Sequence, residues 1–425
     1  MQRPTARGET RKSGYGDSDR FDSQSRRASY GNDGDRGEQD DSREDLRRGK
    51  FDLTFVGIAL LLVVLGLLFV LSSSSYTAGI KGDSFSDFRS QLTWAIVGFG
   101  AMVTMTVIDY RILKHPKLVL ALICGTLLLL VLLLILPTNA GFLRAPKING
   151  ARRWLRIMAG ETILLSLQPS EIAKFAVILF LAVRLSVRQK DVKSFLKTVV
   201  PCMLVAGVFF LLIMGQPNLS TAGTLIIVTI IMLFIAGASI PQIGGIILAM
   251  IPVAIYYANS KEYRKDRLLS FVDPWAVQGD EGYQLVQSLY ALANGGLFGT
   301  GFGMSRQKYS FLPYASSDFI FAIVAEEVGL IGSLAILALF ALLVYRGLHI
   351  AIHCPDRFGS LLAAGLTVLL AVQVVINIAV VTGSMPTTGL PLPFFTLGGT
   401  SLAIFMAEIG ILLSISRLKS ATDPR

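Results

Sequence analysis

The chain alternates long apolar stretches with short polar connections. A stretch of about 20 apolar residues is long enough to cross a hydrocarbon layer of about 30 Å as a helix. The pattern predicts an all-α polytopic membrane protein with about ten transmembrane helices within residues 51–418. The ten apolar stretches occupy residues 52–73, 91–109, 117–137, 168–187, 195–215, 219–237, 241–258, 318–345, 359–383 and 398–416.

The basic residues of the connections predict which helix ends face the cytoplasm. Short cytoplasmic connections carry an excess of Lys and Arg. Such residues precede the first stretch and follow the second, fourth, eighth and tenth, so they share one side of the membrane if both termini are cytoplasmic. Two connections that also carry charge are then external, at residues 138–167 and 259–317. The second of these is a large loop between helices 7 and 8.

Both ends of the chain are polar. Residues 1–50 contain 12 basic and 11 acidic residues and almost no aliphatic ones, so they cannot bury enough apolar surface to fold. We therefore expect a disordered cytoplasmic tail at residues 1–50 and a short second cytoplasmic tail at residues 419–425.

The composition argues against several classes of function. The chain is 52% hydrophobic and 16% charged, with a formal net charge of +10. Most of that charge follows residue 50, where the preference for cytoplasmic cations already accounts for it, so we expect no nucleic-acid partner. The three cysteines are isolated and the three histidines lack metal-ligand spacing. A disulfide framework, a zinc site and a histidine-based triad are therefore not expected.

The first external loop contains a basic motif, "GARRWLRIM". On a helix, Arg152, Arg153 and Arg156 would share one face and Trp154 another. We predict an interfacial amphipathic helix whose guanidiniums bind a diphosphate through paired hydrogen bonds. A purely structural interface anchor is the alternative.

An ionisable pair follows in "QPSEIAK". Pro169 is suited to the start of a helix, and Glu171 and Lys174 lie three residues apart on one face. Charged residues inside an apolar stretch normally face a cavity or a partner, so both are candidates for substrate binding. A structural pair within one helix explains the motif almost as well.

The second external loop and the last connection carry further candidates. Arg267 is a cation there, and "YQLVQSLYAL" predicts a short amphipathic helix with Gln284, Gln287 and Ser288 on one side. A glycine run at residues 295–303 predicts a tight re-entrant or surface loop. The prolines and glycines of residues 383–401 interrupt a helix, and irregular backbone at membrane depth lines a wet cavity or is buried in protein.

Three acids accompany the start of the eighth stretch. On a helix, Glu326 would lie about 80° and Glu327 about 180° around from Asp318, and both would lie roughly 12–14 Å deeper. These separations exceed the roughly 5–9.5 Å between the carboxylates of a two-acid glycosidase. We interpret Asp318 as a single acid at the external mouth, or as an N-cap. We expect the two glutamates to bind neighbouring helices or to line a cavity.

Five motifs in this order resemble the SEDS family of shape, elongation, division and sporulation proteins: "GARRW", "QPSE", "DPW…GYQ…QS", "LP…DFIFA…EE" and "LPLPF…GG". The resemblance covers almost everything after residue 50, and "GYQ" and "QSLYA" look more like the cell-division branch. It implies a glycosyltransferase that polymerises lipid II into peptidoglycan strands at the outer face of the bacterial plasma membrane, for this branch at the septum. It also implies an essential aspartate at Asp318. The sequence departs from the usual family pattern at residues 314–317, Asn218, Ser220 and Thr396.

The resemblance also implies partners and a mechanism. The expected partners are a class B penicillin-binding protein, which crosslinks the strands, and other membrane proteins of division or elongation. We assign Asp318 as the general base that takes the proton of the attacking sugar hydroxyl. The arginines, with a divalent ion such as Mg²⁺ or Mn²⁺ left open, would stabilise the departing diphosphate. No organic cofactor is expected, and a precursor flippase and a division scaffold remain alternatives.

Overall fold

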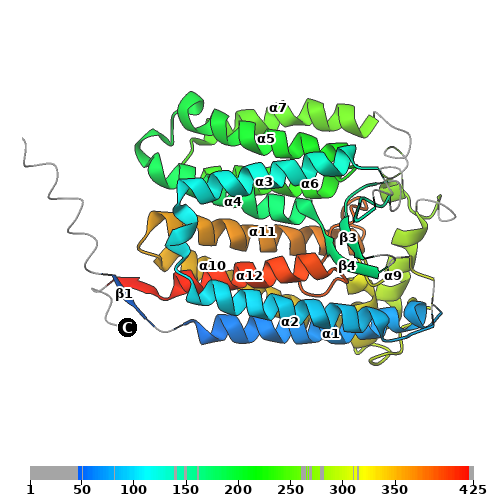
Figure 1. The fold of residues 1–425 in the computed structure, drawn as a ribbon. Helices are drawn as coiled ribbons and strands as arrows, with labels where there is room; N and C mark the ends of the chain where they lie inside the picture. Colours follow the sequence, from blue (N-terminus) through cyan, green and yellow to red (C-terminus); the bar gives the residue numbers. More distant parts are fainter. Residues whose placement is uncertain are drawn as a thin grey trace, which may run out of the picture.

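The computed structural model describes residues 46–49, 51–80, 82–137, 141–147, 151–159, 162–259, 265, 267, 270–277, 282–309, 311–313 and 315–420. Most of the predicted tails, residues 1–45 and 421–425, lies outside the described residues. The described part is a bundle of long helices (Figure 1). The helices are α1 Leu53–Ile80, α2 Ser86–Val107, α3 Pro116–Ile135, α4 Pro169–Val187, α5 Val200–Gly215, α6 Leu219–Ala236, α7 Ile240–Asn259, α9 Tyr283–Gly295, α10 Ile320–His353, α11 Arg357–Val381 and α12 Gly399–Ser416.

Each predicted stretch coincides with a long helix, and the all-α polytopic membrane fold is confirmed. Eight helices of the described part are long and apolar enough to cross a membrane, if the short π-helical turn Phe195–Val199 is counted with α5. Helix α4 is not among them, and it carries Glu171, Lys174 and Arg184. Helix α7 has only a shorter apolar part, Ile240–Pro252. The number ten and the orientation in the membrane stay predictions.

The two ends of the described chain meet on one side of the bundle. Strand β1 (Leu46–Arg48) pairs antiparallel with β5 (Leu418–Ser420), at the left of Figure 1. Two further contacts lie near them: Arg346 of α10 forms an ion pair with Asp52 (2.8 Å), and Arg417 lies over the ring of Phe51. Both ends therefore lie on the same side, as the orientation prediction requires.

The predicted amphipathic helix around Arg152–Arg156 is wrong. Strands β2 (Leu143–Arg144), β3 (Leu155–Ala159) and β4 (Thr162–Leu167) form a three-stranded antiparallel sheet in this loop. The segment of residues 155–167 is rich in leucine and isoleucine and has a Gly-Glu pair at its centre, where glycine suits a two-residue hairpin turn. The helical spacing of the arginines was therefore misleading.

Helix α10 is interrupted at Gly329, where φ is 69°. The glycine-rich loop after α9 replaces the broken helical hydrogen bonds on both sides of this point. A Cβ at Gly329 would overlap the backbone of Gly299 in that loop, so the close approach requires glycine. Because the bonded part of α10 lies roughly 9–17 Å beyond its start, the loop enters the layer of the helices as a re-entrant segment. The bonds are Thr300 N to Glu326 O, Gly301 N to Glu327 O, Leu330 N to Gly296 O and Ile331 N to Leu297 O.

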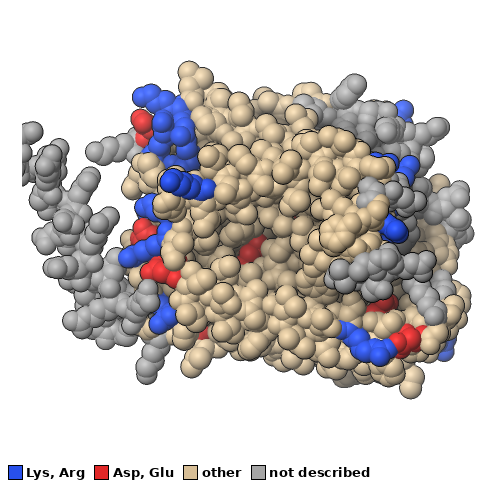
Figure 2. Space-filling model, in the orientation of Figure 1, with Lys and Arg blue, Asp and Glu red and all other residues tan. Residues whose placement is uncertain are grey.

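Charge separates the surface of the bundle into zones. Lys and Arg gather at its two ends, and the belt between them is almost entirely uncharged in this view (Figure 2). Inside, α11 packs against α4, α6 and α10, while α12 packs along α2. The end that carries the sheet and α9 is opposite the paired termini (Figure 1), and we treat it as the external end.

Candidate functional site

Asp318 lies in the turn just before α10, at the external end of the bundle. The N-cap residue of α10 is Phe319, and no side chain donates or accepts a capping hydrogen bond there. The N-cap role proposed for Asp318 is therefore wrong. Its side chain is half-buried. Burial is the main reason why the pKa of Asp318 is raised to about 6, while its own backbone amide, Arg267 and Arg153 act in the opposite direction. Two arginines from separate external loops therefore act on this carboxylate.

The structure separates the arginines that the sequence grouped together. Arg152 donates to the carbonyl of Leu136 at the end of α3 (2.7 Å), and Arg153 donates to the carbonyl of Pro217 before α6. Arg156 lies in β3, opposite Ser166 of β4. Trp154, like the three arginines, is half-buried. Of the three, Arg153 is the one that acts on Asp318, and Arg267 joins it from residues 259–317.

Glu171 and Lys174 form a buried ion pair rather than an open binding site. Lys174 Nζ lies 2.9 Å from Glu171 Oε1, and the side chains are 2% and 1% exposed. Ser401 of α12 donates to the other carboxylate oxygen (3.1 Å), and Lys174 lies over the ring of Phe405. The pair joins α4 to α12, which favours the structural alternative for this motif.

Two of the polar residues of α9 donate hydrogen bonds to different segments of the chain. Gln284 donates to the carbonyl of Pro313 (3.2 Å), within the segment that leads to Asp318. Ser288 is buried and donates to the carbonyl of Val381 at the end of α11 (2.8 Å). Gln287 is half-buried. Gln284 therefore links α9 to the segment before Asp318, and Ser288 links α9 to the end of α11.

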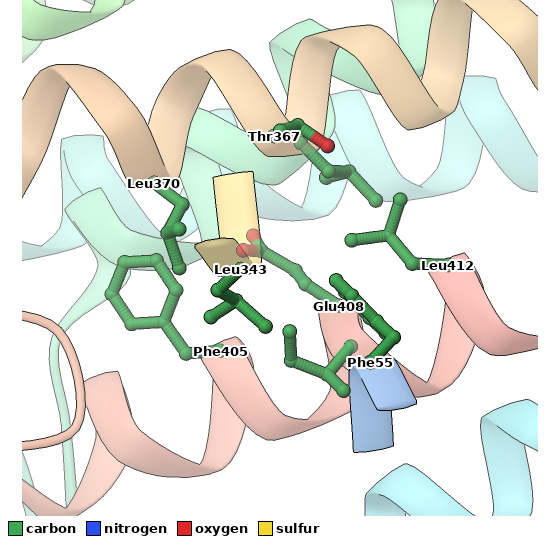
Figure 3. A pocket seen from close by; sticks show the side chains of 9 residues that line it. Phe55, Leu343, Thr367, Leu370, Phe405, Glu408 and Leu412 are labelled. Atoms are coloured by element: carbon green, nitrogen blue, oxygen red, sulfur yellow. The ribbon is translucent and has the colours of Figure 1, made fainter. Parts of the chain in front are cut away.

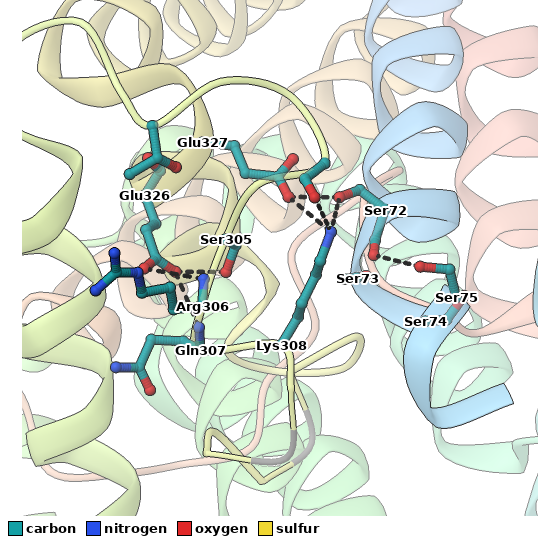
Figure 4. Close-up of polar contacts among 12 residues, drawn as sticks. Ser72, Ser73, Ser74, Ser75, Ser305, Arg306, Gln307, Lys308, Glu326 and Glu327 are labelled. Atoms are coloured by element: carbon teal, nitrogen blue, oxygen red, sulfur yellow. Dashed lines mark hydrogen bonds and ion pairs between the residues drawn. The ribbon is translucent and has the colours of Figure 1, made fainter. Parts of the chain in front are cut away.

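Glu326 and Glu327 bind parts of the protein other than Asp318 (Figure 4). Glu326 accepts hydrogen bonds from the Ser305 hydroxyl and from the backbone N–H groups of Arg306 and Gln307. Glu327 accepts from Ser72 of α1, and its carboxylate lies 3.6 Å from the ammonium of Lys308. The prediction that these glutamates bind neighbouring helices is confirmed for Glu327, which contacts α1, whereas the contacts of Glu326 named here are to a loop. Together they hold the re-entrant loop against α1 and α10.

Glu408 lines a small pocket between α1, α10, α11 and α12. Its wall is apolar except for Glu408 and Thr367, and the carboxylate of Glu408 points into it (Figure 3). The lining residues include neither Asp318 nor the external arginines. This pocket is therefore separate from the Asp318 site.

The described residues do not offer a metal-ligand set. No group of three or more His, Cys, Asp or Glu side chains within the described ranges could hold a metal ion. Two of the neighbours that act on Asp318 are arginines, which repel a cation. A site for Mg²⁺ or Mn²⁺ made of one carboxylate and the phosphates of a substrate stays a prediction, and no step below depends on one.

Sequence reasoning missed Asn377, a buried residue one turn before the end of α11. Its amide donates to the carbonyls of Asp318 and Leu390 (2.8 Å each). The available signal was a single amide inside an apolar helix, where polar groups are costly. The positions that depart from the family pattern also have contacts here: Asn218 caps α6, Ser220 donates to the Thr388 carbonyl, and Thr396 donates to the Ser317 carbonyl.

These motifs and this fold match a known family. A family model described as "Cell cycle protein", for FtsW, RodA and SpoVE, matches residues 52–421. The chain belongs to this family, the SEDS family. The membrane domain matched by the family model is the same region in which the five motifs occur.

Curated SEDS relatives match over nearly their whole length. Stage V sporulation protein E of Bacillus subtilis is 42% identical over 367 residues, which cover 86% of this chain and 97% of the relative. A protein of Geobacter sp. (strain M18) named probable peptidoglycan glycosyltransferase FtsW is 38% identical, with coverage of 87% and 98%. Relatives named for sporulation and for FtsW both match, so the assignment to the division branch stays a prediction.

Solved structures show the same SEDS fold. A chain from a structure described as "Structural coordination of polymerization and crosslinking by a peptidoglycan synthase complex" is 28% identical, with a TM-score of 0.69 and coverage of 86% of this chain and 98% of that chain. The rod shape determining protein RodA of Thermus thermophilus is 25% identical, with a TM-score of 0.60 and coverage of 86% and 97%.

Proposed function

We propose that this chain is a peptidoglycan glycosyltransferase that polymerises lipid II at the outer face of the plasma membrane. The family and the names of its relatives support the reaction class. The observation that supports the site is the effect of Arg153 and Arg267, from two separate external loops, on the carboxylate of Asp318.

The proposed step joins two sugars with loss of a lipid diphosphate. The 4-hydroxyl of the acceptor attacks the anomeric carbon of the donor, and the bond from this carbon to the diphosphate oxygen breaks. Asp318 accepts the hydroxyl proton, and its raised pKa makes it a stronger base than an exposed carboxylate while leaving it mostly ionised at pH 7. Arg153 and Arg267 donate hydrogen bonds to the diphosphate and stabilise the charge that develops on it.

The partner in this proposal is a class B penicillin-binding protein. Support comes from the structural neighbour, which is described as a peptidoglycan synthase complex that coordinates polymerisation with crosslinking. Location at the division septum belongs to the same proposal and follows from the resemblance to the division branch.

The flippase alternative has less support. A translocation path for a charged headgroup would use interior charges, and the sequence offers Lys174, Glu326 and Glu408 for it. Lys174 is paired with Glu171 and Glu326 binds the re-entrant loop, and both side chains are buried. Glu408 alone lines a pocket. A scaffold without activity would tolerate replacement of Asp318, so one experiment separates it from the enzyme.

The test is polymerisation of lipid II by the purified protein with its partner, followed as glycan strands on a gel. We expect Asp318→Asn to abolish strands and Asp83→Asn to retain them. Asp83 is a matched control because it lies in the α1–α2 connection at the same end of the bundle and pairs with Arg89. A folded, partner-bound Asp318→Asn protein with normal polymerisation would remove Asp318 from the mechanism. Headgroup transfer across liposomes without strands would support the flippase instead.

A further inference from the structure

The turn that presents Asp318 is bound at three consecutive backbone carbonyls. The backbone carbonyls of Ser316, Ser317 and Asp318 each accept one hydrogen bond. One donor lies in α11, and the other two lie in the loop between α11 and α12. A turn bound at successive residues has little freedom to move relative to its partner segment. The donors are Leu397 N to Ser316 (2.9 Å), Thr396 Oγ1 to Ser317 (3.1 Å) and Asn377 Nδ2 to Asp318 (2.8 Å).

Asn377 uses one nitrogen for two bonds. Its side chain is buried (1% exposed), and Nδ2 donates both to the Asp318 carbonyl and to the Leu390 carbonyl, each at 2.8 Å. The two hydrogens of an amide nitrogen allow this bridge, whereas a hydroxyl has a single hydrogen to donate. Asn377 therefore ties the Asp318 turn to the loop between α11 and α12 at one point.

The tied loop also faces the carboxylate itself. Gly389 precedes Leu390 and has a φ of 73°. A Cβ built on Gly389 would lie 3.5 Å from Asp318 Oδ2, so this glycine backbone lies beside the carboxylate. The bond from Asn377 to Leu390 therefore fixes the backbone that borders the carboxylate, and the bond to Asp318 fixes the backbone that carries it.

Thr396 supplies a second point of attachment. Its hydroxyl donates to the Ser317 carbonyl and accepts from the backbone N–H of Leu392 (2.8 Å). The loop is thus joined to the Asp318 turn at two points after Gly389: at Leu390 through Asn377, and at Thr396 directly. Thr396 is one of the positions that depart from the family pattern, and serine would retain the hydroxyl.

We propose that Asn377 and Thr396 are positioning residues that hold the Asp318 carboxylate against the loop between α11 and α12. This inference rests on the proposed role of Asp318 as general base. A base must lie within hydrogen-bond reach of the hydroxyl that it deprotonates, and a displacement of about 1 Å can lower the rate by roughly 100-fold. Neither positioning residue needs to touch the substrate.

The first comparison is between Asn377→Leu and Gln373→Leu. Gln373 lies one turn earlier on α11 and is fully buried, and its side chain has no hydrogen-bond partner within the described residues, so it is a matched control for lost polarity. We expect Asn377→Leu to lower kcat for lipid II by roughly 10- to 100-fold at nearly constant KM. We expect Gln373→Leu to retain the parental kcat.

The second comparison removes or keeps one hydroxyl. Thr396→Val has nearly the same shape as threonine and should fold even if Asn377→Leu does not. We expect Thr396→Val to lower kcat and Thr396→Ser to retain the parental kcat. The acid limb of the pH profile should also move to lower pH in Asn377→Leu and Thr396→Val, because a loosened turn admits water and removes the burial that raises the pKa of Asp318.

The outcomes separate this inference from the proposed function. Parental kcat and an unchanged acid limb in folded Thr396→Val and Asn377→Leu, with Asp318→Asn inactive, would overturn the positioning role alone. Equal losses in Asn377→Leu and Gln373→Leu would also overturn it, because general packing would then explain the loss. Normal activity of Asp318→Asn would overturn the proposed function and this inference with it.

Discussion

The buried pair of Glu171 and Lys174 makes a quantitative prediction about stability. Lys174→Met removes the ammonium and leaves the Glu171 carboxylate buried, with Ser401 as its hydrogen-bond donor. Glu408 of α12 also acts electrostatically on this pair. The substitution therefore leaves a buried carboxylate without its cation between α4 and α12, and we expect the fold to weaken.

The size of the effect follows from the distance. At 2.9 Å and an effective dielectric constant of about 20, the attraction between the two charges is about 6 kcal/mol. Part of this offsets the cost of burying the charges, and breaking a buried pair by removal of one partner costs about 3–5 kcal/mol. Glu171→Gln should cost less, because the amide oxygen still accepts from Ser401 and Glu408 remains near Lys174.

The assay is a double-mutant cycle for the free energy of unfolding, measured by denaturation in mixed micelles. The cycle contains the parent, Glu171→Gln, Lys174→Met and the double variant. We expect the double variant to lose less stability than the sum of the single variants, because the surviving partner is no longer stranded. Parental stability in Lys174→Met together with a raised KM for lipid II would refute this reasoning. The pair would then belong to substrate binding, as its sequence context first indicated.

Three further predictions concern the external end. If Asp318 is the base, kcat/KM should fall about tenfold between pH 7 and pH 5, because the pKa is about 6, and a flat profile would contradict this role. Arg267→Gln removes a cation that lowers the pKa of Asp318, so the acid limb of the kcat/KM profile should move to higher pH at low ionic strength. An unchanged acid limb would show that Arg267 does not act on Asp318. Gly299→Ala should reduce the yield of folded protein in size-exclusion chromatography, because its Cβ would overlap the Glu327 backbone, whereas Gly57→Ala has free space and should not.

The sequence predicted the helices well because each is specified locally. A stretch such as residues 117–137 is almost entirely apolar after Lys117, and a helix is the structure that satisfies its backbone in lipid. The same reasoning failed for residues 152–156, where arginine spacing fitted one helical face but the neighbouring residues favoured strands. That segment is predicted to lie outside the hydrocarbon layer, where the rule that makes membrane helices predictable does not apply.

The candidate site was predicted in part, for a physical reason. Asp318 could be separated from Glu326 and Glu327 by helical geometry, since the three residues are close in sequence. Its neighbours could not be found in that way. Asn377 is 59 residues from Asp318, and the contact depends on how α11 packs against the turn before α10. No local spacing encodes such a contact.

A polar side chain buried in an apolar helix remains a useful signal once its partners are known. Gln373 and Asn377 are both buried in α11, yet only Asn377 has hydrogen-bond partners among the described residues, and these belong to the Asp318 turn and the adjacent loop. Glu171 and Lys174 are equally buried, but they form an ion pair with each other. All four residues can be found because their polar side chains are buried. Their partners then show which of them join two helices and which hold the residue that reacts. The comparison of Asn377→Leu with Gln373→Leu measures that difference directly.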